Sequence, residues 1–138
     1  MQVQPYLTFN GDCEAALLFY GEILGGQITF MMRFKDAPGS EPVDPAWADK
    51  IMHCNFSAGS TQFMAADCSP ERASAKKSGF TMSVAVDTVA EGEKVFDGLA
   101  ADGQITMPFQ ATFWTKGFGM LVDKFGTPWM VNCLEQPA

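Results

Sequence analysis

Alternating apolar and polar positions at the start of the chain predict a strand followed by a helix. Residues 3–9 alternate as a half-buried strand does, and Asn10-Gly11-Asp12 then interrupts the pattern. From Glu14 to Leu24 apolar side chains recur at helical spacing, and Gly25-Gly26 is typical of a left-handed helix end. Further apolar runs predict strands at about 28–34, 51–57 and 61–67. The first half of the chain therefore has the predicted order β-α-β-β-β.

The same order of elements recurs in the second half. The tetrapeptide Gly26-Gln27-Ile28-Thr29 returns in register as Gly103-Gln104-Ile105-Thr106, and a capping-box pattern at Thr88-Val89-Ala90-Glu91 predicts the start of the second helix. The strands expected in this half lie at about 105–114, 120–123 and 129–133. We expect module 1 at about 1–68, a linker at about 69–78 and module 2 at about 79–138.

A segment rich in Pro, Gly and acidic residues, at about 36–48, distinguishes module 1 from module 2. Such a composition predicts an exposed loop. The loop is interpreted either as a lid over a binding site or as a simple surface excursion, and the isolated Trp47 at its end favours the lid.

A four-stranded sheet with one helix has one covered face and one bare face, so two such modules are expected to pair. The predicted fold class is α+β, with two tandem βαβββ modules whose curved mixed sheets surround a cavity and whose helices lie on the outer faces. Strand alternation assigns Gln4, Tyr6 and Thr81 to the inner face.

The amino-acid composition limits which kinds of binding partner the protein can have. The chain has 138 residues, 47% of them hydrophobic, and a formal net charge of −7, which predicts one globular domain and argues against nucleic acid or an anionic membrane as partner. It lacks an apolar run of about 18 residues and an export signal, so a soluble cytoplasmic protein is expected. The four cysteines have no metal-binding spacing and are expected to be reduced thiols.

Two sequence motifs resemble one protein superfamily. The run from Phe19 to Gly25 (FYGEILG) and the longer run from Phe113 to Asn132 (FWTKGFGMLVDKFGTPWMVN) are similar to the vicinal oxygen chelate superfamily, which includes glyoxalases, extradiol dioxygenases and bleomycin-resistance proteins. The second run resembles the PhnB-like branch, whose members carry the label 3-demethylubiquinone-9 3-methyltransferase-like. No glycine-rich turn of the kind that holds a nucleotide-bearing cofactor is present in the sequence, so methyl transfer is not supported.

The resemblance implies a divalent metal held by His or Glu from the first and last strands of each module. The corresponding positions here are Gln4 (or Pro5), Thr81, Met64 and Met130, which supply no imidazole, carboxylate or thiolate. The chain has a single histidine, so one chain cannot supply two histidines to a metal. We therefore expect no cofactor, with a divalent metal as the less favoured alternative.

The cavity wall is expected to be aromatic and sulfur-rich, which suits a small apolar or aromatic ligand. His53 is interpreted either as a hydrogen-bonded structural histidine or as a catalytic acid–base group whose tautomer Asp67 fixes. The alternative for each apolar wall residue is that it fills the core. The candidate ligand-binding residues are Gln4, Tyr6, Met64, Thr81, Trp114, Trp129 and Met130.

The sequence is consistent with two functions from different classes. One is a metal-independent protein that binds a small molecule, as the resistance proteins of the superfamily do. The other is a lyase, isomerase or dioxygenase-type enzyme that uses His53 or a metal shared between subunits. The resemblance also implies a homodimer.

Overall fold

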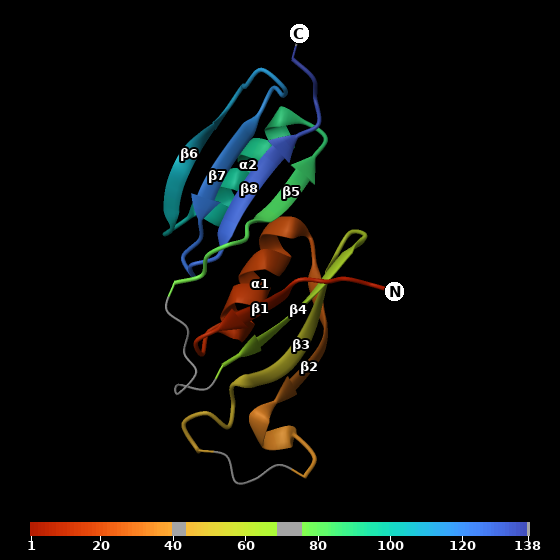
Figure 1. The fold of residues 1–138 in the computed structure, drawn as a ribbon, viewed down its shortest axis with the longest axis vertical. Coiled ribbons are helices and arrows are strands. Elements are labelled where there is room, and N and C mark those ends of the chain that lie inside the picture. The colour runs from red at the N-terminus through yellow and green to blue at the C-terminus, as the bar shows by residue number, and fades with distance from the viewer. Residues whose placement is uncertain (40–43, 69–75, 138) are drawn as a thin grey trace. The chain divides into compact units, whose positions relative to one another are not determined.

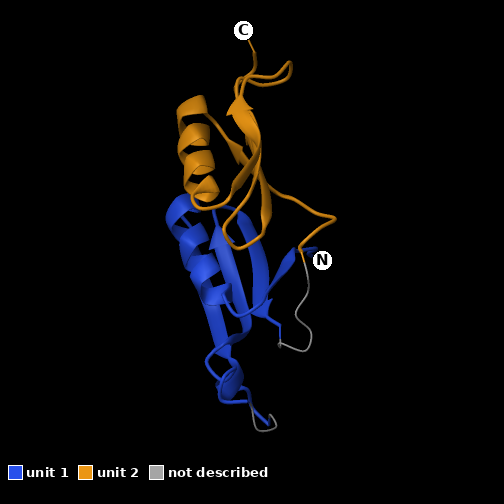
Figure 2. Ribbon diagram, turned by 90° about the vertical axis from the view of Figure 1, so that its left-hand side faces the viewer, with its two compact units in different colours: residues 1–75 blue, residues 76–138 orange. Residues whose placement is uncertain are grey.

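The computed structural model describes residues 1–39, 44–68 and 76–137 (Figure 1). The fold is α+β and consists of two compact units, residues 1–75 and 76–138 (Figure 2). The predicted linker at about 69–78 lies mostly outside the described residues, as does part of the predicted loop at 36–48.

Unit 1 is one βαβββ module and unit 2 is another, as the internal repeat predicts. Unit 1 contains β1 (Tyr6–Phe9), α1 (Cys13–Leu24), β2 (Gln27–Arg33), the short 3-10 helix η1 (Phe34–Asp36), β3 (Ile51–Ala58) and β4 (Thr61–Asp67). Unit 2 contains β5 (Met82–Val86), α2 (Val89–Ala100), β6 (Gln104–Gln110), β7 (Phe118–Val122) and β8 (Pro128–Cys133).

The two sheets have the same topology. Sheet 1 has the strand order β1-β4-β3-β2 and sheet 2 the order β5-β8-β7-β6. In each sheet the first and last strands of the module are parallel, and the other neighbours are antiparallel. The register is also shared, because Tyr6 pairs with Met64 in sheet 1 and Ser83 pairs with Met130 in sheet 2. Equivalent positions can therefore be compared residue by residue.

Each helix lies along one side of its own sheet (Figure 2). In unit 1 the fully buried Leu17 and Tyr20 of α1 belong to the same core as Phe9, Cys54 and Phe56 of the strands. The last turn of α1 ends as predicted, at Gly25 in the left-handed conformation with φ of 69°. No helix in the described part of the chain is long and apolar enough to cross a membrane.

The other side of sheet 1 is not covered by α1, and strand alternation decides which side chains lie there. Because Cys54 and Phe56 of β3 face the helix, His53 and Asn55 point to the opposite side. We call this side open face 1. By the same alternation and pairing it carries Tyr6, Thr8, Phe30, His53, Asn55, Met64 and Ala66.

Unit 2 repeats this division. Helix α2 begins at the predicted Thr88, whose Oγ1 accepts a hydrogen bond from the backbone N–H of Glu91 at 3.1 Å. Leu121 and Val131 are buried on the helix side. The opposite side, open face 2, carries Ser83, Ala85, Met107, Phe118, Met120, Met130 and Asn132.

Two predicted strands were too long. The first strand begins at Tyr6 rather than at residue 3, and β6 ends at Gln110 rather than at Trp114. Beyond Gln110 the backbone turns, and the N–H of Thr112 donates to the carbonyl of Thr115 at 2.9 Å. Trp114 therefore lies in the loop between β6 and β7.

Candidate functional site

Three side chains of open face 1 form a continuous hydrogen-bonded chain. The hydroxyl of Tyr6 on β1 lies 2.9 Å from Nδ1 of His53 on β3, and Nε2 of His53 lies 2.9 Å from Oδ1 of Asn55. Strand β4 lies between β1 and β3, so the two side chains reach each other across it. We call these three residues the Tyr6–His53–Asn55 chain.

The donor in each of these hydrogen bonds follows from the chemistry of the atoms. Oδ1 of Asn55 can only accept, so Nε2 of His53 carries the proton in the neutral ring. Nδ1 is then an acceptor, and the hydroxyl of Tyr6 donates to it. Within the Tyr6–His53–Asn55 chain, the lone pairs of the Tyr6 oxygen then accept no hydrogen bond.

Tyr6 is well suited to remain a donor. Partial burial, and secondarily the nearby thiols of Cys54 and Cys13, hold the pKa of Tyr6 above its ordinary value of 10.0. The residue is nevertheless 48% exposed.

Aromatic rings surround the Tyr6–His53–Asn55 chain on open face 1. The ring centroids of Tyr6 and His53 are 5.6 Å apart, and those of Phe30 and His53 are 6.2 Å apart. Phe30 is 46% exposed although it is a large apolar residue. The polar chain therefore lies beside an accessible aromatic surface.

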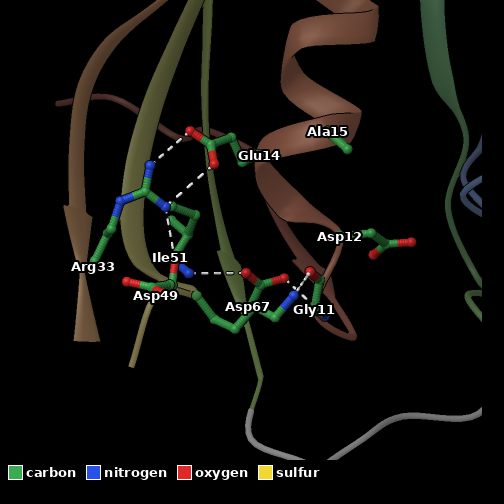
Figure 3. Close-up of a pocket in the computed structure, with 9 residues that line it drawn as sticks. Gly11, Asp12, Glu14, Ala15, Arg33, Asp49, Ile51 and Asp67 are labelled. Atoms are coloured by element: carbon green, nitrogen blue, oxygen red, sulfur yellow. Dashed lines mark hydrogen bonds and ion pairs between the residues drawn. The ribbon is translucent and has the colours of Figure 1, made fainter. Parts of the chain in front are cut away.

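Asp67 lies on the other side of sheet 1, so the predicted His53–Asp67 pairing is wrong. Its Oδ1 accepts hydrogen bonds from the N–H groups of Gly11 and Cys13, and its Oδ2 accepts one from the N–H of Ile51, each at 2.9 Å. Figure 3 shows Asp67 between Gly11 and Ile51. Asp67 is only 3% exposed. It therefore caps the start of α1 and joins β3 to β4, and Tyr6 and Asn55 are the residues that contact His53.

A cavity of about 290 Å³ lies on the Asp67 side of unit 1 (Figure 3). The guanidinium of Arg33 forms an ion pair with Glu14 at 2.8 Å and donates to the carbonyl of Asp49 at 2.7 Å. Lys50 donates to the carbonyl of Gly11 at 2.8 Å. Both cations therefore have partners within the chain. Their contacts attach the segment before β3 to the start of α1.

The thiol of Cys13 is not activated by its place at the start of α1. Its Sγ lies 3.6 Å from Sγ of Cys54, and both side chains are fully buried. The hydrogen bond with Cys54, together with burial, raises the pKa of Cys13. All four cysteines are free thiols.

Open face 2 has an aromatic and sulfur-rich character. The indole N–H of Trp114 donates to Oδ1 of Asn132 at 3.1 Å, and the Trp114 ring contacts Phe118 and Phe113 edge-on, with centroids 5.2 Å and 4.9 Å apart. Trp114 is 42% exposed. The hydrogen bond to Asn132 orients the indole at the edge of this face.

Trp129 and Met130 are neighbours on β8 and point to opposite sides of sheet 2. Met130 lies on open face 2, whereas Trp129 is buried on the helix side with its indole N–H donating to Oδ2 of Asp123 at 2.8 Å. The prediction that Trp129 lines the inner face is therefore wrong.

The shared register shows how the two open faces differ. Met64 and Met130 are equivalent, but Tyr6 corresponds to Ser83. In the same comparison the positions of His53 and Asn55 in sheet 1 are taken by Phe118 and Met120 in sheet 2. At the two positions on the third strand of each module, open face 1 thus carries hydrogen-bonding side chains and open face 2 carries apolar ones.

The donor set at the superfamily's metal positions does not fit a divalent metal. Gln4 precedes β1 and donates to the side chain of Gln2 at 3.1 Å, and Thr81 precedes β5. Met64 and Met130 occupy the last-strand positions with thioethers, which are poor ligands for Zn²⁺, Mn²⁺ or Fe²⁺. Across residues 1–39, 44–68 and 76–137, no three His, Cys, Asp or Glu side chains are grouped as metal ligands.

Comparison with known proteins identifies the protein family. Residues 2–131 match the Glyoxalase/Bleomycin resistance protein/Dioxygenase superfamily, and the chain belongs to this family. It is 38% identical to protein YjdN of Escherichia coli (strain K12), over 99% of this chain and 97% of that protein.

Solved structures agree with this assignment. The crystal structure of protein PA1353 from Pseudomonas aeruginosa is 44% identical, with a TM-score of 0.89 over 99% of both chains. A putative 3-demethylubiquinone-9 3-methyltransferase, PhnB protein, from Bacillus cereus is 26% identical, with a TM-score of 0.78 over 96% of this chain and 99% of that one. The fosfomycin resistance protein FosX of Listeria monocytogenes shares the fold at 8% identity and a TM-score of 0.66, over 96% of this chain and 90% of that one.

Asn55 and Phe30 were not predicted as candidate site residues from the sequence. Asn55 is two residues after His53 on the same strand, so strand alternation places both on one face and could have identified it. Phe30 lies opposite Asn55 through the pairing of β2 with β3, which contains a bulge that the sequence pattern does not reveal.

Proposed function

We propose that this protein binds a small apolar or aromatic molecule on the open faces of its sheets, without the divalent metal of its superfamily. The observation that carries the proposal is the Tyr6–His53–Asn55 chain beside the exposed ring of Phe30. Small-molecule sites generally combine an apolar wall with a few well-placed polar groups. Open face 1 supplies both, and the thioethers at the metal positions supply further apolar surface.

A neutral fluorescent dye, N-phenylnaphthylamine, tests this proposal with two neighbouring variants. Phe30 and Met31 are adjacent on edge strand β2 and similarly exposed, at 46% and 37%, but they point to opposite sides of sheet 1. Phe30→Asp should weaken dye binding by metal-stripped protein at least tenfold, because it places a charge in the apolar wall. Met31→Asp makes the same change in charge and should bind the dye as the wild type does.

Two results would contradict this assignment. If neither variant changes the dye affinity, the ligand does not contact open face 1. If both variants weaken binding equally, the effect belongs to the edge strand as a whole rather than to the face. Thermal unfolding of both variants, followed by circular dichroism, establishes that each is folded.

An enzyme is the second candidate, and the hydrogen bonds of His53 favour it specifically. A neutral imidazole whose Nδ1 accepts from Tyr6 can take up a proton, and Asn55 holds the ring in place. A variant His53→Gln that binds the dye normally but has lost turnover of a substrate would support catalysis. Equal loss of binding and turnover would indicate a binding role only.

We further propose that the protein is a cytoplasmic homodimer. The exposed edge strand β6 supports association, because Ile105 and Met107 are 51% and 40% exposed. Light scattering after size exclusion should give twice the chain mass of 15.0 kDa. A mass of one chain would contradict the dimer.

A further inference from the structure

We infer that the Tyr6–His53–Asn55 chain recognises a ligand that donates a hydrogen bond, and that this ligand is an aromatic alcohol of the phenol type. The inference rests on the proposed binding function and adds the chemical class of the ligand. It follows from the order of donors and acceptors along the chain and from the aromatic ring next to it.

The direction of the hydrogen bonds decides whether the Tyr6 oxygen can accept a hydrogen bond from a ligand. Asn55 Oδ1 receives the proton of His53 Nε2, and His53 Nδ1 receives the proton of the Tyr6 hydroxyl. The Tyr6 oxygen has therefore given its only proton inward, and both of its lone pairs are left for a donor from outside. A ligand hydroxyl supplies such a donor, whereas an ether or a ketone does not.

The hydrogen bonds in series also strengthen one another. A hydroxyl that donates to an imidazole becomes a better acceptor, because charge shifts toward its oxygen. Asn55 acts through His53 in this inference: it is a positioning residue, which fixes the tautomer that makes His53 an acceptor for Tyr6.

The apolar neighbours indicate that the hydroxyl belongs to an aromatic ring. The Phe30 and Tyr6 rings lie on either side of His53, with centroid distances of 6.2 Å and 5.6 Å, and both are about half exposed. A planar ring can contact these surfaces in offset or edge-on geometry. No acidic side chain is among the described residues of open face 1, so the face also lacks the carboxylate that an amine would favour.

Naphthol and its methyl ether, methoxynaphthalene, separate hydroxyl recognition from apolar binding. Both should displace N-phenylnaphthylamine from the wild-type protein, with naphthol bound about tenfold more tightly, the difference expected for one hydrogen bond. Tyr6→Phe should remove this preference, because it removes the oxygen that accepts from the naphthol hydroxyl. Asn55→Leu should reduce the preference, because it removes the acceptor that keeps the proton on Nε2.

Ring-nitrogen NMR gives a second readout, because His53 is the only histidine of the chain. The free protein should show the proton on Nε2, and naphthol should shift the Nδ1 signal in the wild type but not in Tyr6→Phe. A proton on Nδ1, or equal affinities for naphthol and its ether, would overturn the inference while leaving the proposed binding function intact. Failure of the dye and both naphthalenes to bind would overturn the two together.

Discussion

Replacing Asp67 with Asn should destabilise unit 1 strongly, because one buried carboxylate satisfies three backbone donors. Oδ1 serves the N–H groups of Gly11 and Cys13, and Oδ2 serves the N–H of Ile51. An Asn side chain can keep the first two bonds but turns an NH₂ group toward the N–H of Ile51. The N–H of Ile51 and the new NH₂ group are then both without an acceptor, and the other two bonds lose their charged acceptor.

The magnitude follows from these losses. A hydrogen bond to a charged group contributes about 1.5–3 kcal/mol, and an unsatisfied buried donor costs about 1–3 kcal/mol. After partial compensation, Asp67→Asn should lower the free energy of unfolding by about 2–4 kcal/mol, a large part of the roughly 5–15 kcal/mol of an ordinary domain. Helix α1 has no local substitute, because Asp12 at its N-cap position makes no side-chain capping bond.

Urea unfolding followed by circular dichroism measures this effect, and Asp12→Asn is the matched control. Both substitutions remove one negative charge at the same end of α1, but only Asp67 is buried and hydrogen-bonded there. The control should change the free energy of unfolding by at most about 1 kcal/mol, the contribution of a charge near a helix end. Equal effects of the two variants would refute the structural role assigned to Asp67.

Three further predictions concern both units. The raised pKa of Tyr6 means that the folded state holds its proton more tightly than the unfolded state, so this contribution is present below about pH 10 and is lost above it. Tyr6→Phe should therefore flatten the alkaline fall of the unfolding free energy, and an unchanged slope would contradict the account. Thr88→Ala should cost about 1 kcal/mol in urea unfolding through loss of the α2 cap, and no change would mean that the cap is dispensable. Trp129→Phe should lower the free energy of unfolding by about 1–3 kcal/mol, because the indole donates to the buried Asp123. Dye binding should stay intact. A loss of dye binding with normal stability would indicate that Trp129 contacts the ligand.

Local patterns predicted the elements of this fold well. The end of α1 at Gly25, the start of α2 at Thr88 and the limits of β4 depend on neighbouring residues, and the structure confirms all three. The repeat also predicted the shared topology of the two units. These three boundaries depend on local turn and capping residues, whereas alternation alone predicted the first strand and β6 too long.

The contacts of the candidate site depend on strand order, which a local pattern does not contain. Tyr6 and His53 are 47 residues apart in the sequence. They meet because the strand order places β1 and β3 on either side of β4. His53 and Asp67 lie on neighbouring strands, and this proximity suggested a pair. The register places Cys54 opposite Ala65, so Asp67 points toward the helix and His53 away from it.

Binding by metal-stripped protein tests the central claim most directly. We would measure the affinity for N-phenylnaphthylamine before and after adding Zn²⁺, Ni²⁺, Mn²⁺ or Fe²⁺, and titrate each ion alone by calorimetry. The account predicts dye binding that is unchanged by the ions and no stoichiometric ion binding below micromolar concentration. Stoichiometric binding of one ion, with dye affinity that depends on it, would contradict the claim that this family member binds its ligand without a metal.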